Sequence, residues 1–215
     1  MFLSIKNIPK VYWSSDKTFN FKPKFSTSFF LILGLIMFGF GEGLLILSTT
    51  GNSPWSVLAE GISKNSELSI GVATFLVSVS VLFLWIFLKQ KPGLGTIFNI
   101  IIISGMIDIT LYFFDAPSSL LFKYLLSILS VIIVGIGSGI YLVANLGPGP
   151  RDGLMTGLTI ITKLPIALVR AFLEISVVIA GWYLGGTVGV GTLIFAFGIG
   201  PCVAFGLFVV NKIFS

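Results

Sequence analysis

The 215-residue chain contains no histidine and a single cysteine, Cys202. Without histidine, a Ser-His-Asp triad and metal or haem sites that depend on histidine are excluded. One cysteine cannot form an intrachain disulfide or a cysteine cluster. The sequence also lacks the G-x-x-x-x-G-K-[ST] pattern of a nucleotide-phosphate loop. We therefore expect no metal, no cofactor and no enzymatic activity.

Charge is also scarce. Only 10% of the residues are charged and 55% are hydrophobic, whereas soluble domains carry about 25% charged residues. Such a chain cannot cover a globular surface with polar groups, so we expect an integral membrane protein with the lipid bilayer as its surroundings. The net charge of +5 does not indicate nucleic-acid binding, because most basic residues lie near the N-terminus and in short loops.

Six apolar stretches are each close to the roughly 20 residues that a membrane-spanning helix needs. They cover about 28–48, 69–88, 95–114, 120–145, 165–184 and 191–211. Continuous apolar runs favour helices over the alternating strands of a barrel. The predicted fold is an all-α bundle in one membrane domain, residues 28–215, preceded by a polar tail, residues 1–27.

The basic residues predict an orientation. Ten fall on one side of the predicted spans and two on the other, which by the positive-inside rule places both termini in the cytoplasm. The first group is Lys6, Lys10, Lys17, Lys22, Lys24, Lys89, Lys91, Arg151, Lys163 and Lys212, and the second is Lys64 and Lys123.

An internal duplication is the most informative pattern. Residues 39–105 align with 135–201 at a constant offset of 96, and about fifteen of the aligned pairs are identical. Each copy, about 28–114 and 120–211, holds three spans, so the second must enter the membrane from the opposite side. Such inverted repeats are typical of secondary transporters. The matched glycine and proline motif is Gly51, Pro54 and Gly95 in the first copy, and Gly147, Pro150 and Gly191 in the second, where Gly149 precedes the proline.

A short segment lies between the first two spans of each copy, at 51–68 and 147–164. Proline is favourable at the first position of a helix, and Ser53 is suited to cap the first segment. Both are too short to span. Each is therefore either a half-helix that enters the bundle, as in transporters, or an amphipathic helix on its surface.

Two glycine triplets, at 39–43 and 135–139, have the pattern G-x-G-x-G. Small residues at this spacing allow helix backbones to approach closely. The triplets predict tight packing between the span at 28–48 and the span at 120–145. They do not indicate a dinucleotide site, because no strand precedes them.

Besides Lys123, four charged residues lie within the predicted spans, where charge is costly and is a candidate for function. Glu42 is in the first span, and Arg170 and Glu174 share one face of the fifth at a spacing of four. Asp108 lies in the outer part of the third span, close to the interface, and ranks last among these candidates. None has a charged counterpart in the other copy. One interpretation is that Arg170 binds an anionic group while Glu174 or Glu42 exchanges a proton. The other is that Arg170 and Glu174 neutralise each other.

Arg151 and Asp152 begin the second short segment, directly after Pro150. Free N–H groups at a helix N-terminus together with a guanidinium can bind an anion. Alternatively, the pair is an exposed turn that adds to the basic character of one side. We include both residues among the candidates for substrate binding.

Several motifs resemble the YczE/YyaS type of bacterial membrane protein, a relative of the broader YitT membrane family. They are GFGEGLLILSTTGNSPWSVLAEGI, GPGPRDGLMTGL, RAFLEISVVIAGWYLGGTVGVGT and FGIGP, and the resemblance covers about residues 30–210. It implies a multi-pass fold in the bacterial inner membrane and places Arg151, Asp152, Arg170 and Glu174 in shared motifs. It implies no particular biochemical activity.

Two functions follow as hypotheses. The first is a small secondary transporter or permease for a polar or anionic small molecule, in which one repeat rocks against the other. The second is a membrane accessory or assembly factor that transports nothing. A transporter needs a polar cavity that contains Arg170 or Glu174, and an accessory protein needs a closed, dry core. A homodimer fits a chain of this size.

Overall fold

A computed structural model describes residues 8–214, and every regular element in this range is a helix. The eight helices are α1 (Phe25–Leu47), α2 (Pro54–Lys64), α3 (Ile70–Phe87), α4 (Leu94–Phe113), α5 (Leu120–Val143), α6 (Pro150–Thr162), α7 (Ile166–Tyr183) and α8 (Val190–Phe214). Six of them, all except α2 and α6, are long and apolar enough to cross a membrane. The all-helical fold and the six predicted spans are thereby confirmed to within a few residues. The inverted relation of the two repeats stays a prediction.

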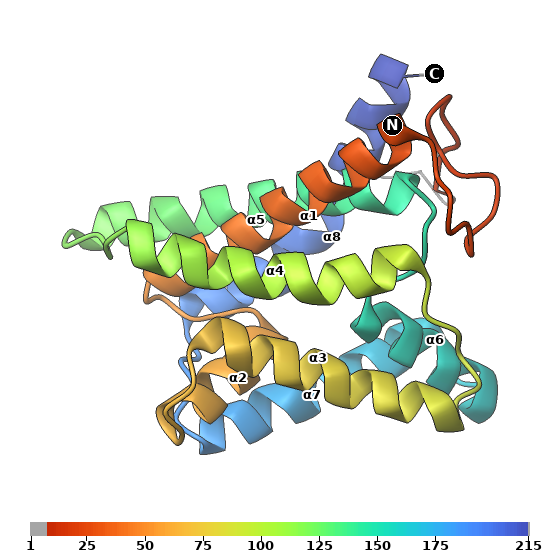
Figure 1. Cartoon of the computed structure of the whole chain (residues 1–215). Coiled ribbons are helices and arrows are strands. Elements are labelled where there is room, and N and C mark those ends of the chain that lie inside the picture. Colours follow the sequence, from red (N-terminus) through yellow and green to blue (C-terminus); the bar gives the residue numbers. More distant parts are fainter. Residues whose placement is uncertain (1–7, 215) are drawn as a thin grey trace.

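The helices form two layers (Figure 1). In the first layer, α1 packs between α4 and α5, and α5 packs in turn against α8. In the second layer, α2 and α6 each contact both α3 and α7. The layers meet where α3 packs on α4 and where α4 touches α6. Each layer therefore combines helices from both sequence repeats.

The glycine triplets hold the first layer together. A Cβ atom on Gly41 would lie 2.7 Å from Val134 of α5, and one on Gly137 would lie 2.7 Å from the carbonyl oxygen of Gly34 in α1. These middle glycines pack α1 against α5, as the sequence predicts. The outer glycines of each triplet lie on the opposite side of their helix, because two residues turn a helix by about 200°. They pack instead against α4 from α1 and against α8 from α5.

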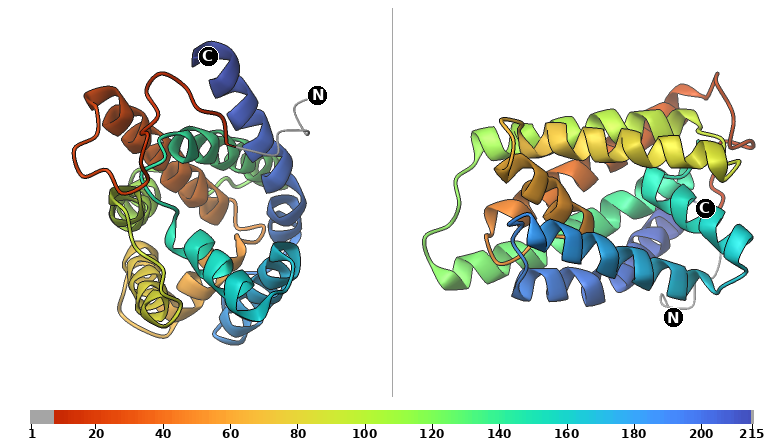
Figure 2. Two further views of the ribbon diagram at one scale, coloured as in Figure 1. Left: turned by 90° about the vertical axis from the view of Figure 1, so that its right-hand side faces the viewer. Right: turned by 90° about the horizontal axis from the view of Figure 1, so that it is seen from below.

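The two short helices enter the bundle with their N-terminal turns, whereas the last turn of α6 is exposed. Seen from below in Figure 2, they occupy opposite ends of the second layer. Their N-termini meet in the interior, where the guanidinium of Arg151 lies 5.3 Å from the ring centre of Trp55. Pro54 and Pro150 each occupy the first helical position. The structure thus favours half-helices over surface helices.

Glycine contacts between backbones anchor the loops that lead into the short helices. Gly51 and Gly147 have φ angles of +124° and +117°, in the region that favours glycine. Beside them, Thr50 O accepts a hydrogen bond from Gly191 N (2.9 Å), and Leu146 O accepts one from Gly95 N (2.7 Å). Thr50 corresponds to Leu146 and Gly95 corresponds to Gly191 at the offset of 96 between the copies. Corresponding residues of the two copies therefore make the same backbone contact.

Residues 8–24 pack against the bundle, although the sequence indicates a polar tail. Trp13 is fully buried against Phe30 and Phe214. The side chain of Asn145, in the loop before α6, donates a hydrogen bond to the carbonyl oxygen of Ser15 (2.8 Å). Helix α1 begins at Phe25, three residues before the predicted span. Lys6 and the rest of residues 1–7 lie outside the described range.

Candidate functional site

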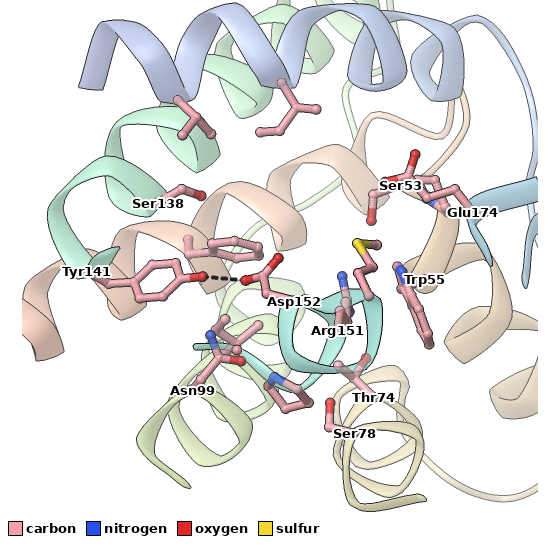
Figure 3. Close-up of a pocket in the computed structure, with 18 of the residues that line it drawn as sticks. Ser53, Trp55, Thr74, Ser78, Asn99, Ser138, Tyr141, Arg151, Asp152 and Glu174 are labelled. Carbon is pink, nitrogen blue, oxygen red and sulfur yellow. Dashed lines mark hydrogen bonds between the residues drawn. The ribbon is translucent and has the colours of Figure 1, made fainter. Parts of the chain in front are cut away.

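A cavity of about 180 Å³ lies between the two layers and receives side chains from all eight helices. Ser53 and Trp55 from α2, Arg151 and Asp152 from α6, and Glu174 from α7 line it (Figure 3). Of the five charged residues predicted for the site, four line this cavity: Arg151, Asp152, Arg170 and Glu174. The structure therefore brings together candidates that lie in two separate sequence motifs.

Arg151 and Asp152 are neighbours in sequence, but their charged groups do not pair. The Asp152 carboxylate accepts a hydrogen bond from the Tyr141 hydroxyl (2.9 Å) through Oδ2. The Arg151 guanidinium instead lies over the ring of Trp55. Within the described residues, Arg151 makes no side-chain hydrogen bond and no ion pair. The cavity therefore holds a positive and a negative group that are kept apart.

Burial and neighbouring charge act on Arg151 in opposite directions. Burial lowers the pKa of its guanidinium, whereas the negative charges of Glu42 and Asp152 raise it. A guanidinium stays protonated at physiological pH even so. Arg151 is thus a permanent cation in a region of low polarity.

Arg170 and Glu174 form the ion pair that their spacing allows, with Nε and Oε1 2.8 Å apart. The side chain of Arg170 is 49% exposed and that of Glu174 is 24% exposed. Both line the cavity, so the pair lies at its edge rather than in its centre. Arg170 and Glu174 can therefore neutralise each other and still contact a ligand, because Oε2 of Glu174 has no partner among the described residues.

Glu42 does not line the cavity directly. Its Oε2 accepts hydrogen bonds from Ser53 (2.7 Å) and Ser56 (2.6 Å) in the first turn of α2, and its Oε1 is buried with no partner in the described structure. Ser53 is the N-cap residue, as predicted, but its hydroxyl binds Glu42 rather than the helix backbone. Ser53 thus separates the Glu42 carboxylate from the cavity.

Other polar groups on the cavity wall are also uncommitted. The indole nitrogen of Trp55 and the hydroxyl of Ser104 are buried and have no partner among the described residues. Asn99 and Ser78 line the cavity and form no side-chain hydrogen bond in the described part of the chain. Buried polar groups without partners cost free energy, so this wall is suited to a ligand that supplies them.

Three residues escaped the sequence reasoning. Tyr141 binds the Asp152 carboxylate and the ring of Trp55 lies against the Arg151 guanidinium, yet in the sequence both look like ordinary aromatic residues. Glu60 is buried in α2, where its carboxylate accepts hydrogen bonds from the backbone nitrogen and hydroxyl of Thr187 (2.6 and 2.8 Å). The sequence feature that could have identified Glu60 is its charge, because it lies in the short segment between two predicted spans. Its role is to fasten α2 to the loop between α7 and α8.

With this geometry established, comparison with known proteins identifies the family. Residues 25–207 match the family described as "Family of unknown function (DUF6198)". The chain belongs to this family. The match covers all of the helices except the last turns of α8, and therefore the whole cavity.

Three relatives extend this result. An uncharacterised protein of Haemophilus influenzae is 38% identical over 97% of this chain and 95% of its own length. The uncharacterised membrane protein YczE of Bacillus subtilis is 31% identical, over 83% of this chain and 84% of its own. The uncharacterised protein YyaS of the same organism is 30% identical, over 75% and 83% respectively. The resemblance to the YczE/YyaS type is thus confirmed. No solved structure matches.

Proposed function

We propose that the protein is a small permease that binds a polar or anionic small molecule in the cavity between the two layers. The observation that carries this proposal is the cavity itself, because it places Arg151 and Asp152 where the N-termini of two short helices meet. Broken helices that end at a central binding site are a recurring feature of secondary transporters. An accessory protein with a closed, dry core has no need of this arrangement.

The electrostatics of the site support a polar solute. Helix N-termini carry a partial positive charge, and the N-terminal turns of α2 and α6 both line the cavity. Charged groups inside a membrane protein are expensive and mark pathways for solutes or ions. Binding and passage require no chemical step, so the proposal includes no catalytic role for these residues.

The contacts suggest which parts move. The sequence favours rocking of one repeat against the other, but each repeat contributes helices to both layers. Extensive packing joins α1 to α5 and α5 to α8, and α2 joins α3 to α7. We therefore propose that the layer of α1, α4, α5 and α8 moves relative to the layer of α2, α3, α6 and α7, with the packing of α3 on α4 as the joint and the cavity between the layers.

We also propose an orientation in the bacterial inner membrane with both termini in the cytoplasm. Figure 1 shows the start of α1 and the last turns of α8 at the same end of the bundle. The loop before α4 is at this end as well, because Gly93 contacts the backbone of Leu146, next to Asn145, which binds the N-terminal segment. Lys89 and Lys91 in that loop thus join the basic residues of the N-terminal segment, in agreement with the positive-inside rule.

Uptake into proteoliposomes tests the proposal. The purified full-length chain is reconstituted and offered radiolabelled solutes, including inorganic phosphate, propionate and alanine. We expect at least one solute to accumulate faster than in empty liposomes, and Arg151→Gln to abolish the difference. Lys91→Gln removes the same charge from an exposed loop and should leave uptake unchanged. If no solute in a broad panel enters, and if Arg170→Ala changes only stability, the protein is not a permease of this kind.

A further inference from the structure

We infer that the ligand of the cavity is a small zwitterion, whose carboxylate binds Arg151 and whose ammonium group binds Asp152. The inference rests on the proposed function, since it names the substrate class of the same site. It follows from the way in which the structure holds these two opposite charges apart inside one cavity (Figure 3).

Opposite charges attract each other at short range. Arg170 and Glu174 lie four residues apart on one face of α7 and form a contact of 2.8 Å. Arg151 and Asp152 are consecutive residues of α6, so their side chains leave the helix in directions about 100° apart. Tyr141 binds the carboxylate, and the guanidinium lies over the ring of Trp55. Each therefore keeps free binding capacity. A ligand that satisfies both must carry a negative and a positive group.

The sum of the charges argues against a ligand of one sign. The charged residues that line the cavity are two arginines and two acids, whose formal charges sum to zero: Arg151, Arg170, Asp152 and Glu174. A simple anion would bind Arg151 but would leave the site with a net negative charge. A simple cation would bind Asp152 but would leave Arg151 without an anion. A zwitterion meets both requirements and leaves the net charge unchanged.

The size and the walls of the cavity narrow the class further. Its volume of about 180 Å³ is below the about 300 Å³ at which pockets for drug-sized ligands begin. Asn99 and Ser78 on the wall, which form no side-chain hydrogen bond among the described residues, provide additional polar groups. These features fit a compact molecule of the size of a small amino acid.

A matched set of probes tests the inference by thermal unfolding of the purified full-length chain in detergent. Alanine, β-alanine and 4-aminobutyrate carry both charges at increasing separation. Propionate lacks the ammonium group of alanine, and ethylamine lacks its carboxylate. A ligand that binds the native state raises the melting temperature in proportion to the logarithm of its concentration. We expect at least one zwitterion to do so, and neither single-charge probe to do so at the same concentration.

Variants then assign the contacts. Arg151→Gln and Asp152→Asn should each weaken binding of that zwitterion about tenfold or more, because each removes a charged partner of the ligand. Lys91→Gln, with the same loss of charge on an exposed loop, should bind as the wild type does. Should Arg151→Gln fail to fold, Asp152→Asn decides alone, since asparagine preserves the shape and still accepts the Tyr141 hydrogen bond.

The possible results are distinct. If no zwitterion stabilises the protein, or if propionate stabilises it as much as alanine does, the inference is overturned. Should propionate also enter proteoliposomes, the permease function stands with an anion as its substrate. If a zwitterion binds but does not enter, the inference stands and the permease function fails.

Discussion

Replacement of Gly34 by alanine tests whether direct contact between the backbones of α1 and α5 holds the first layer together. The new Cβ atom would lie 2.7 Å from both the carbonyl oxygen of Gly137 and the backbone nitrogen of Tyr141. Ordinary contacts of this kind begin at 3.4 Å. Both obstacles are main-chain atoms of a packed helix, so no side chain can move aside, and α5 itself must shift.

The expected cost follows from two opposing effects. Overpacking costs typically about 1–3 kcal/mol, and we expect the upper end because backbone atoms are involved. Alanine gains up to about 1 kcal/mol over glycine inside a helix. The net loss for Gly34→Ala is therefore about 2 kcal/mol in the free energy of unfolding.

Gly105 of α4 provides the matched control. It lies inside a helix of the same layer, but nothing lies within 4 Å of a Cβ atom placed there. Gly105→Ala should leave the protein as stable as the wild type or up to about 1 kcal/mol more stable. Reversible unfolding in mixed detergent micelles measures both variants. Equal stability of Gly34→Ala and Gly105→Ala would refute the reasoning.

Three further predictions concern features away from the cavity. Glu60→Gln should cost about 2–3 kcal/mol of unfolding free energy, because its buried carboxylate accepts several hydrogen bonds. Lys64→Gln removes a half-exposed ion pair and two exposed hydrogen bonds, to Gly185 O and Thr187 Oγ1, and should cost about 1 kcal/mol or less; similar losses for the two variants would contradict this account. Trp13→Ala should cost about 3–5 kcal/mol of unfolding free energy in the same assay, as loss of a fully buried aromatic residue does. It should also make residues 8–24 more sensitive to protease, and an unchanged digest would argue against the packing of this segment. In a cysteine-free background, Lys91→Cys should be protected from a membrane-impermeant maleimide in intact cells and Asp115→Cys should be labelled, and the reverse pattern would invert the proposed orientation.

The sequence was sufficient for the helices because length and composition alone decide which segments can cross a bilayer. The six long helices begin and end within a few residues of the predicted stretches. The glycine triplets were harder. Their spacing predicts close packing, but Gly39 and Gly43 face α4 while Gly41 faces α5, and that division depends on how the helix is rotated about its axis.

The candidate site was predictable in part. A charged residue within an apolar stretch is visible in any sequence, and this made Arg170 and Glu174 candidates for binding. Arg151 and Asp152 became candidates because they follow Pro150 at the start of a short helix. Tyr141 could not be recognised, because its importance depends on a hydroxyl that points to Asp152 from another helix. The same holds for Trp55, which meets Arg151 only because two short helices from different repeats end at one place.

The paired loop anchors at Gly51 and Gly147 have a consequence for how such a chain can diverge. Their contacts are formed by backbone atoms, so they constrain only those positions at which any side chain would intrude. At the glycines of these anchors a side chain would meet main-chain atoms, so we expect little substitution there. The matched pair Thr96 and Thr192 belongs to the same pattern, because each hydroxyl accepts a hydrogen bond from the backbone nitrogen of the glycine three residues before it. A search for similarity between the halves should therefore give weight to the matched glycines and to these two threonines.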